Sequence, residues 1–160
     1  MLLRPTDWLR KLNLASPERR LEWFPPFRAL GIRVLELEEK GRRTRIRLPL
    51  SERTRNPGGS MFGGAMASVA DAVPALACAK IFREYTVWTR SLHLEFLREG
   101  RTDLELRFEM EDRQLAEISA ELEQKGRSDP LFRYGFYLGD GLLCARVESR
   151  VAIRATGQPG

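Results

Sequence analysis

The sequence is poor in the residues from which metal sites and disulfide frameworks are built. Its 160 residues include 2 cysteines and 1 histidine. Cys78 and Cys144 lie far apart in apolar surroundings and form no CxxC motif, so neither a zinc site nor a disulfide framework is indicated. His93 has no second imidazole to help it bind a metal, and we expect it to serve structure or an interface. We therefore expect no metal or other cofactor, and a reducing cytoplasm as the location.

Long uninterrupted apolar runs are also missing. The most apolar segment, residues 61–82, is broken by two glycines, an aspartate and Pro74, whereas a membrane span needs about 20 predominantly apolar residues. The N-terminal charges are too closely spaced for the apolar core of a signal peptide. We therefore predict no membrane span and interpret residues 63–83 as a buried helix, kinked by Pro74 just after the aspartate.

Charge of one sign does not gather in a stripe, although the net charge is +5. The arginines are interleaved with glutamates, and in residues 43–48 they alternate with Thr, Ile and Leu as on the solvated face of a strand. No aromatic pattern of an RNA-binding module accompanies them, so we predict no nucleic-acid partner. The length and ordinary composition fit one soluble globular domain.

Apolar periodicity predicts the order of the elements. Residues 1–26 form a helical lead-in in which Ser16 caps a helix that begins at Pro17, and Pro25-Pro26 ends it. Residues 156–160 are predicted to be a disordered tail. Strands are predicted in residues 30–50 (a hairpin turning at Lys40-Gly41), 86–100, 102–110, 131–138 and 142–154, with a short helix at 112–126 closed by Gly126 and a hairpin turn at Gly139-Asp140-Gly141.

The helix at residues 63–83 is apolar nearly all round and must be wrapped by other elements. Six antiparallel strands from one chain can do this by curling around it. In the strand at 86–100, alternation places Trp88, Arg90, Leu92, Leu94 and Phe96 on one face. The predicted fold class is α+β: residues 27–155 form a hot-dog fold, a curved antiparallel sheet of about six strands around one long central helix.

The segment that leads into this helix resembles that of hot-dog acyl-CoA thioesterases of the phenylacetyl-CoA type. Those enzymes have an asparagine, a His-Gly-Gly turn that opens the central helix, and Ala-Asp further along it. Asn56, Phe62-Gly63-Gly64 and Ala70-Asp71 match that pattern in order and spacing. A closer resemblance is to a mostly uncharacterised bacterial branch of thioesterases, which has Phe-Gly-Gly at the turn and is also similar at residues 85–100. The resemblance covers residues 27–154.

The resemblance implies a site whose chemistry these residues can support. N–H groups at a helix start are unpaired and lie at the positive end of the helix dipole, so Gly63 or Gly64 could donate to the developing oxyanion, an interaction worth roughly 2.7–4 kcal/mol. Asp71, expected to be buried, would attack the carbonyl or deprotonate water. Asn56 would orient that water or the carbonyl. In the family the site is completed across a subunit interface, which implies a homodimer or a dimer of dimers.

Other residues near the turn are candidates for substrate binding. Arg53 and Arg55 could meet the phosphates of coenzyme A. Phe62 stands where the better-known enzymes have histidine and cannot form its hydrogen bonds. Ser68 either hydrogen-bonds to Asp71 or donates to its own i−4 carbonyl.

Simpler interpretations stay open beside these. Asp71 could face solvent or pair with an arginine, Asn56 could only open a turn before Pro57, and the two glycines could only allow close packing of the helix.

Two function classes follow. One is an acyl-CoA thioesterase acting on a small-molecule acyl-CoA. The other is a non-catalytic hot-dog protein that binds an acyl thioester or a fatty ligand. A hot-dog dehydratase is disfavoured, because such enzymes pair their acid with a histidine and His93 is badly placed in the sequence. Turnover that depends on Asp71 distinguishes the first two.

Overall fold

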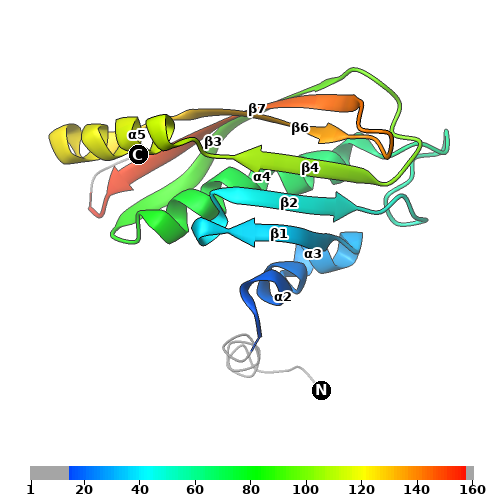
Figure 1. Cartoon of the computed structure of the whole chain (residues 1–160), viewed down its shortest axis with the longest axis horizontal. Helices are drawn as coiled ribbons and strands as arrows, with labels where there is room; N and C mark the ends of the chain where they lie inside the picture. The colour runs from blue at the N-terminus through cyan, green and yellow to red at the C-terminus, as the bar shows by residue number, and fades with distance from the viewer. Residues whose placement is uncertain (1–14, 158–160) are drawn as a thin grey trace.

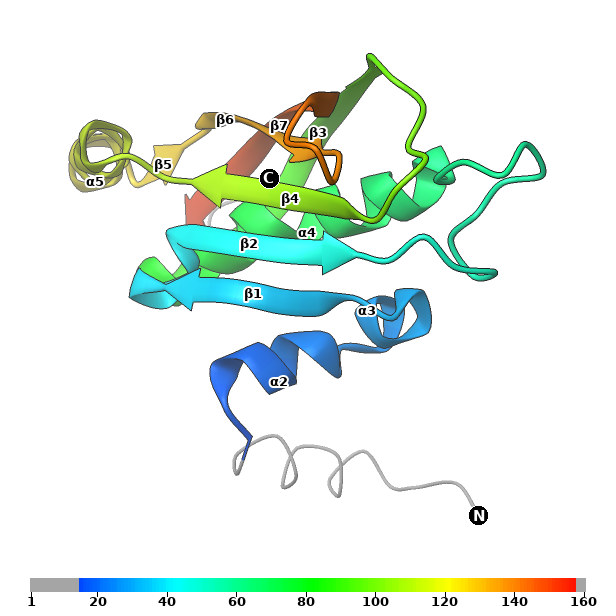
Figure 2. The ribbon, with the colours of Figure 1, turned by 45° about the vertical axis from the view of Figure 1, so that its right-hand side comes forward.

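In a computed structural model of the chain, which describes residues 15–157, a curved antiparallel sheet wraps around one long helix (Figures 1 and 2). The helices are α2 (Pro17–Glu22), α3 (Pro25–Leu30), α4 (Gly63–Ile81) and α5 (Asp112–Lys125), with a 3-10 turn η1 (Glu39–Gly41). The strands are β1 (Arg33–Glu38), β2 (Arg43–Leu48), β3 (Tyr85–Phe96), β4 (Leu104–Glu109), β5 (Arg127–Ser128), β6 (Leu131–Tyr137) and β7 (Leu143–Ala155). The predicted α+β hot-dog fold is confirmed.

The sheet has the order β1-β2-β4-β6-β7-β3, and β5 pairs with β7 at its side. All of these pairs are antiparallel. β1 and β3 are therefore the two edges, and they lie on either side of α4. The prediction of about six strands missed only β5, whose two residues are too short to produce a periodic signal.

The N-terminal segment differs in part from the prediction. Ser16 caps α2 as expected, since its Oγ accepts from the N–H of Arg19 at 3.3 Å. Pro25, however, begins α3 instead of ending the helical segment, because proline fits the first position of a helix. Residues 1–14 of the predicted lead-in and 158–160 of the predicted tail lie outside the described residues.

The strand β3 contains a bulge that the sequence pattern did not predict. Its pairing with β7 shifts between Thr89 and Ser91, and one extra residue moves every later side chain to the other face. Val87 therefore lies on the side of α4, while Trp88 lies on the outer face, where the Arg154 guanidinium stands 5.6 Å from its ring centre. The prediction of one continuous face from Trp88 to Phe96 is wrong.

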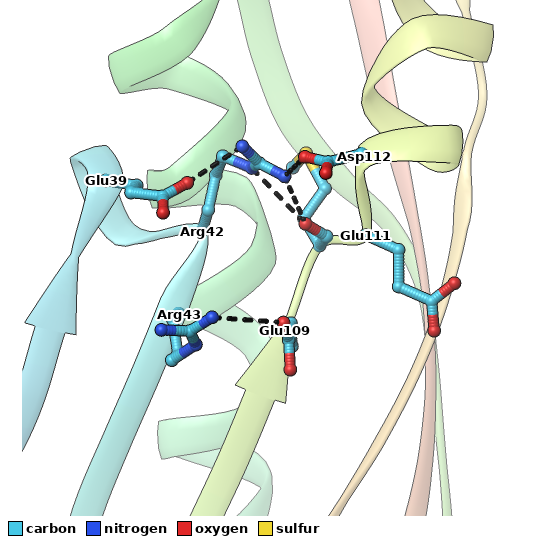
Figure 3. Close-up of a pocket in the computed structure, with 7 residues that line it drawn as sticks. Glu39, Arg42, Arg43, Glu109, Glu111 and Asp112 are labelled. Carbon is cyan, nitrogen blue, oxygen red and sulfur yellow. Dashed lines mark hydrogen bonds and ion pairs between the residues drawn. The ribbon is translucent and has the colours of Figure 1, made fainter.

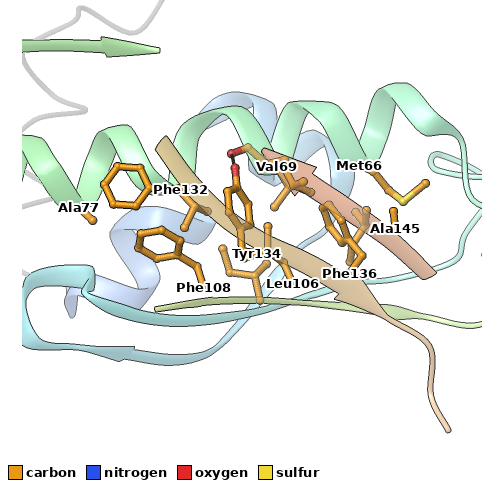
Figure 4. Close-up of a cluster of buried hydrophobic side chains, with 14 of the residues drawn as sticks. Met66, Val69, Ala77, Leu106, Phe108, Phe132, Tyr134, Phe136 and Ala145 are labelled. Atoms are coloured by element: carbon orange, nitrogen blue, oxygen red, sulfur yellow. Dashed lines mark hydrogen bonds between the residues drawn. The ribbon is translucent and has the colours of Figure 1, made fainter. Parts of the chain in front are cut away.

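The core lies between the inner face of the sheet and one side of α4 (Figure 4). α4 buries eight residues there: Ala65, Met66, Val69, Ala70, Val73, Pro74, Ala77 and Cys78. The sheet contributes Leu106, Phe108, Phe132 and Phe136 among others, with Phe108 and Phe132 edge to face at 5.5 Å. By length and composition alone α4 could cross a membrane, but about half of it is packed into this core.

The outer face of the sheet is covered by ion pairs. In β2, Thr44, Ile46 and Leu48 are buried and the three arginines between them face outward, as predicted. Arg43 pairs with glutamates of β1 and β4, and Arg45 does the same. Because these pairs are solvent-exposed, each contributes little to stability, but together they neutralise Arg43 and Arg45.

Leu106 is fully buried between sheet and helix, whereas Leu142 is 50% exposed in the β6–β7 turn. We expect Leu106→Ala to lower the free energy of unfolding by about 2–5 kcal/mol. The matched change Leu142→Ala should stay within about 0.5 kcal/mol of the wild type. Urea unfolding of both variants measures this, and equal losses would contradict the assigned core.

Candidate active site

Asp71 is exposed in the single chain, which corrects the expectation that it is buried. The sheet covers only the side of α4 that carries Ala70 and Val73, and Asp71 lies on the open side. Within residues 15–157 its carboxylate forms no ion pair and no hydrogen bond, so pairing with an arginine is not observed. The acid is therefore available to react with a ligand or a second subunit.

The helical turn that carries Asp71 is held by two hydroxyl groups. Pro74 has no N–H for the carbonyl of Ala70, four residues earlier. The Tyr134 hydroxyl of β6 donates to that carbonyl at 2.6 Å (Figure 4). The Thr89 hydroxyl of β3 donates to the backbone carbonyl of Asp71 at 2.9 Å. These bonds fix the backbone under the acid, and α4 continues unbroken past Pro74 to its end.

Tyr134 acts here as a neutral donor. It is almost fully buried, and burial, with a smaller contribution from the charge of Asp71, raises the pKa of its hydroxyl. Sequence reasoning missed both Tyr134 and Thr89. The signal that could have found Tyr134 is Pro74 itself, because a proline inside a buried helix leaves a carbonyl that needs another donor.

The two glycines at the start of α4 are packed under aromatic rings. Phe62 caps the helix without a side-chain bond, and its own N–H donates to the carbonyl of Thr54 at 2.7 Å. A Cβ on Gly63 would lie 2.9 Å from the Phe96 ring, and one on Gly64 would overlap the Phe62 ring. Glycine therefore does allow close packing. The N–H groups of both glycines also have no backbone acceptor among the described residues.

The loop before α4 uses its polar side chains to hold its own shape. The Asn56 side chain accepts from the N–H of Ser60 at 3.2 Å and donates to its hydroxyl at 3.1 Å. Thr54, which sequence reasoning missed, is fully buried and donates to the carbonyl of Pro49. In the single chain the Asn56 side chain thus bonds within its own turn, through Ser60.

The other candidate binding residues are placed as follows. The Ser68 hydroxyl donates to the Gly64 carbonyl at 2.8 Å, so it returns to its own helix and does not contact Asp71. Arg55 pairs with Glu52, while the Arg53 side chain is exposed without a partner among the described residues. Phe62 is 55% exposed beside the first turn of the helix.

A single chain does not bring the glycine turn and the acid together. Gly63 and Asp71 are eight residues apart on one helix, which corresponds to about 12 Å along its axis. One carbonyl group cannot lie within bonding distance of both. A site that uses both groups therefore needs the acid of one chain and the turn of another.

The open side of α4 forms the floor of a groove of about 910 Å³. Asp71 and Thr89 lie at its end nearer the start of α4, and the groove runs from there toward the C-terminus of α4. Its lining is largely apolar and comes from α2, η1, α4 and β3 and the residues beside them: Pro17, Leu21, Phe24, Leu37, Gly41, Ala72, Ala75, Leu76, Ala79 and Val87. An apolar groove that ends at a free carboxylate is suited to a ligand with an extended chain.

A second cavity, of about 280 Å³, is lined by charged side chains (Figure 3). The Arg42 guanidinium there pairs with Glu39 and Asp112 and donates to the carbonyl of Met110 at 3.1 Å. Arg43 pairs with Glu109 at 3.5 Å. Both cations are already neutralised within this cavity. We therefore interpret its ion pairs as contacts that fix the position of the start of α5.

The cysteines and the histidine are not placed for catalysis in the single chain. Cys78 and Cys144 are buried free thiols, and burial raises the pKa of Cys78 to about 12. His93 is exposed on β3 opposite Glu148, whereas its neighbours Leu92 and Leu94 are the residues that turn inward. No cluster of three metal-binding side chains occurs within residues 15–157.

Comparison with known proteins gives one family and several similar structures. The family model described as "Domain of unknown function (DUF4442)" matches residues 20–150. No curated protein matches the sequence. Protein PA5026 of Pseudomonas aeruginosa, of unknown function and described as a probable thioesterase, is 19% identical with a TM-score of 0.75, and the match covers 96% of this chain and 97% of that one.

Two further structures are similar over most of their length. Thioesterase HI1161 of Haemophilus influenzae is 15% identical with a TM-score of 0.65, covering 90% of this chain and 94% of that one. A mutant form of thioesterase PA1618 of Pseudomonas aeruginosa is 18% identical with a TM-score of 0.62, covering 96% of this chain and 99% of that one. At these identities the comparisons establish a shared fold.

The bond from Tyr134 to the carbonyl freed by Pro74 can be tested by removing one oxygen. Tyr134→Phe leaves that buried carbonyl unsatisfied, and we expect a loss of about 1–3 kcal/mol in the free energy of unfolding. The control is Tyr137→Phe, because Tyr137 packs its ring against Arg107 and its hydroxyl has no partner among the described residues. That variant should change stability by about 0.5 kcal/mol or less. Equal effects would reject the assigned role.

Proposed function

The chain belongs to the DUF4442 family, and from that premise we propose that it is an acyl-CoA thioesterase that acts as a homodimer. The observation that carries the proposal is the carboxylate of Asp71, which has no partner within residues 15–157 and lies at the end of an apolar groove, in a fold shared with thioesterases. Such a carboxylate can deprotonate a water molecule or attack the thioester carbonyl directly.

A catalytic role for Asp71 is supported by two hydrogen bonds that hold its backbone without using its carboxylate. Its backbone carbonyl is bound by Thr89, and the preceding carbonyl is bound by Tyr134. Neither bond uses the carboxylate, so the backbone under the acid is held while both carboxylate oxygens have no partner within residues 15–157. Because Asp71 is exposed, a ligand or a second subunit can reach both oxygens.

A second subunit would complete the site. The β1 edge of the sheet is covered by α2, where Glu22 accepts from the N–H of Val34 at 2.9 Å. The β3 edge is 12 residues long and has no partner strand among the described residues. An exposed edge of that length is a ready template for pairing with another chain. Pairing of two β3 edges, in a dimer or a dimer of dimers, would bring the glycine turn of one subunit toward Asp71 of the other.

In this arrangement each element of the site has a distinct role. Gly63 and Gly64 donate their free N–H groups to the oxyanion that forms on the thioester carbonyl. Asn56 keeps the loop before them in shape, and thereby orients the turn. Phe62 lies beside the carbonyl and excludes water, a role that needs no hydrogen bond. Ser68 stabilises the first turns of the helix, and Arg53 is the cation of this loop that stays free for substrate.

The proposal predicts turnover that depends on Asp71. We expect free-thiol release from a panel of short, long and aryl acyl-CoAs, and a fall in kcat of about 10²–10⁴ in Asp71→Asn. Glu123→Gln, an exposed acid on α5, is the matched control and should keep wild-type kcat. Circular dichroism checks folding. No turnover of any thioester by the wild type would favour the non-catalytic alternative, in which the groove only binds an acyl thioester or fatty ligand.

A second prediction tests the glycine turn and the shared site together. Gly63→Pro and Gly64→Pro each remove one N–H at the start of the helix, where an N–H group has no acceptor within the helix. We expect one of them to lower kcat by about 10²–10³. The matched Gly63→Ala and Gly64→Ala variants keep the N–H but require the exposed rings of Phe96 and Phe62 to move aside. The expected result is therefore a clearly larger loss in the proline variant than in its alanine control at the same position.

Mixing experiments then decide whether the site is shared. An inactive proline variant refolded with Asp71→Asn forms heterodimers in which one site has both intact groups, so activity should return. Activity that does not return in verified heterodimers would place the acid and the turn of one site in the same subunit.

A further inference from the structure

The far end of the groove gathers cations that have no partner among the described residues. It is lined by Arg20 of α2, Lys40 of η1, Lys80 in the last turn of α4, and Arg83, two residues beyond that helix. Within residues 15–157, none of these four side chains forms an ion pair or a hydrogen bond. They come from three separate parts of the chain, so their convergence is a property of the folded groove and not of a charged run in the sequence.

This cluster contrasts with two other groups of cations. On the outer face of the sheet Arg43 and Arg45 are matched by glutamates, and in the charged cavity of Figure 3 both arginines are neutralised. At the groove, Glu18 of α2 is the acid whose field reaches Lys80, and it forms no ion pair with it. Positive charge left uncompensated beside an apolar surface suits an anionic ligand.

The cationic cluster is electrostatically unfavourable for Lys80. The side chain is half-buried, and its burial and the nearby charge of Arg20 lower the pKa of its ammonium group. Both effects would be offset by an anion bound between the two side chains. The unliganded groove is thus electrostatically less favourable than a groove that holds a multiply charged anion.

The distance between Asp71 and Lys80 indicates which chemical group could carry such an anion. Asp71 and Lys80 are nine residues apart on α4, or about 14 Å along the helix axis. A phosphopantetheine arm has about thirteen bonds between its sulfur and its first phosphorus, which corresponds to about four extended residues, or roughly 14 Å. A thioester held at Asp71 by such an arm would therefore carry its phosphates to the cationic end of the groove.

We propose that the groove binds the phosphopantetheine arm of the substrate's thiol carrier, and that Arg20, Lys40, Lys80 and Arg83 bind its phosphates. The inference rests on the proposed function and deepens it by naming the carrier-binding residues. Four converging cations match a diphosphate better than the single charge of a carboxylate at the end of an acyl chain. The arm's amides stay hydrated, because the groove is open to solvent.

The test is direct binding of free coenzyme A to the full chain by calorimetry, which requires no turnover. Lys80→Met keeps the length of the side chain and removes its charge. Since a charge-assisted hydrogen bond contributes about 1.5–3 kcal/mol, we expect the Kd for coenzyme A to rise about tenfold or more, with a similar rise in Arg20→Gln. Lys125→Met, which removes an exposed cation of α5, is the control and should leave the Kd unchanged.

Two further ligands test whether the cations bind the phosphates and whether the groove binds a fatty carboxylate instead. Pantetheine, which lacks phosphates, should bind equally to wild type and Lys80→Met, and dodecanedioate should show no dependence on Lys80. Coenzyme A affinity that is unchanged in all groove variants would overturn the proposal. A loss of affinity in Lys80→Met for dodecanedioate alone would also overturn it. So would a shift in the sedimentation coefficient of Lys80→Met without a change in Kd, because that result would assign the groove to a subunit interface.

The result is separable from that of the hydrolysis assay. Charge-dependent binding of coenzyme A by a protein that hydrolyses no thioester would keep this inference and reject the enzyme. Hydrolysis without any dependence on the groove cations would do the reverse.

Discussion

The arrangement of this molecule depends on how one missing hydrogen bond is replaced. Pro74 lies in the middle of the central helix and leaves the Ala70 carbonyl without its helical donor. A buried carbonyl without a partner would cost about 1–3 kcal/mol, and the Tyr134 hydroxyl removes that cost. The bond ties α4 to the middle of the sheet at the residue before Asp71, so a local defect of the helix fixes the height and rotation of the acid.

The second constraint is that the sheet covers only one side of an apolar helix. The sheet is open, with β1 and β3 as its edges, and does not close around α4, so Ala72, Ala75 and Leu76 are left on an open side. The same side holds Asp71, and its rim is formed by α2 and by the free edge of β3. Groove, acid and unpaired strand edge are therefore consequences of one geometric fact, the incomplete wrapping of the helix.

Helices and strands could be predicted from the sequence where the signal is the apolar periodicity of a single segment. The alternation in residues 43–48 and the apolar run of α4 placed strands and helices correctly. The bulge in β3 could not be predicted, because a single extra residue in a strand carries no distinct composition. The exposure of Asp71 could not be predicted either, since a helix that is apolar all round does not show which side the sheet covers. The cations of the groove come from three elements and are brought together only by the fold.

Another physical explanation exists for two of those cations. Lys80 and Arg83 lie at the C-terminal end of α4, where positive charge interacts favourably with the helix dipole by about 0.3–1 kcal/mol. That effect does not account for Arg20, which belongs to α2, or for Lys40, which belongs to η1. It also gives no reason for Lys80 to lie beside the like charge of Arg20, which lowers the pKa of the Lys80 ammonium group. An anion shared by the cluster explains all four positions with one interaction. Under the two proposals, α4 would present, in order, N–H groups for an oxyanion, a carboxylate, an apolar groove and a phosphate site.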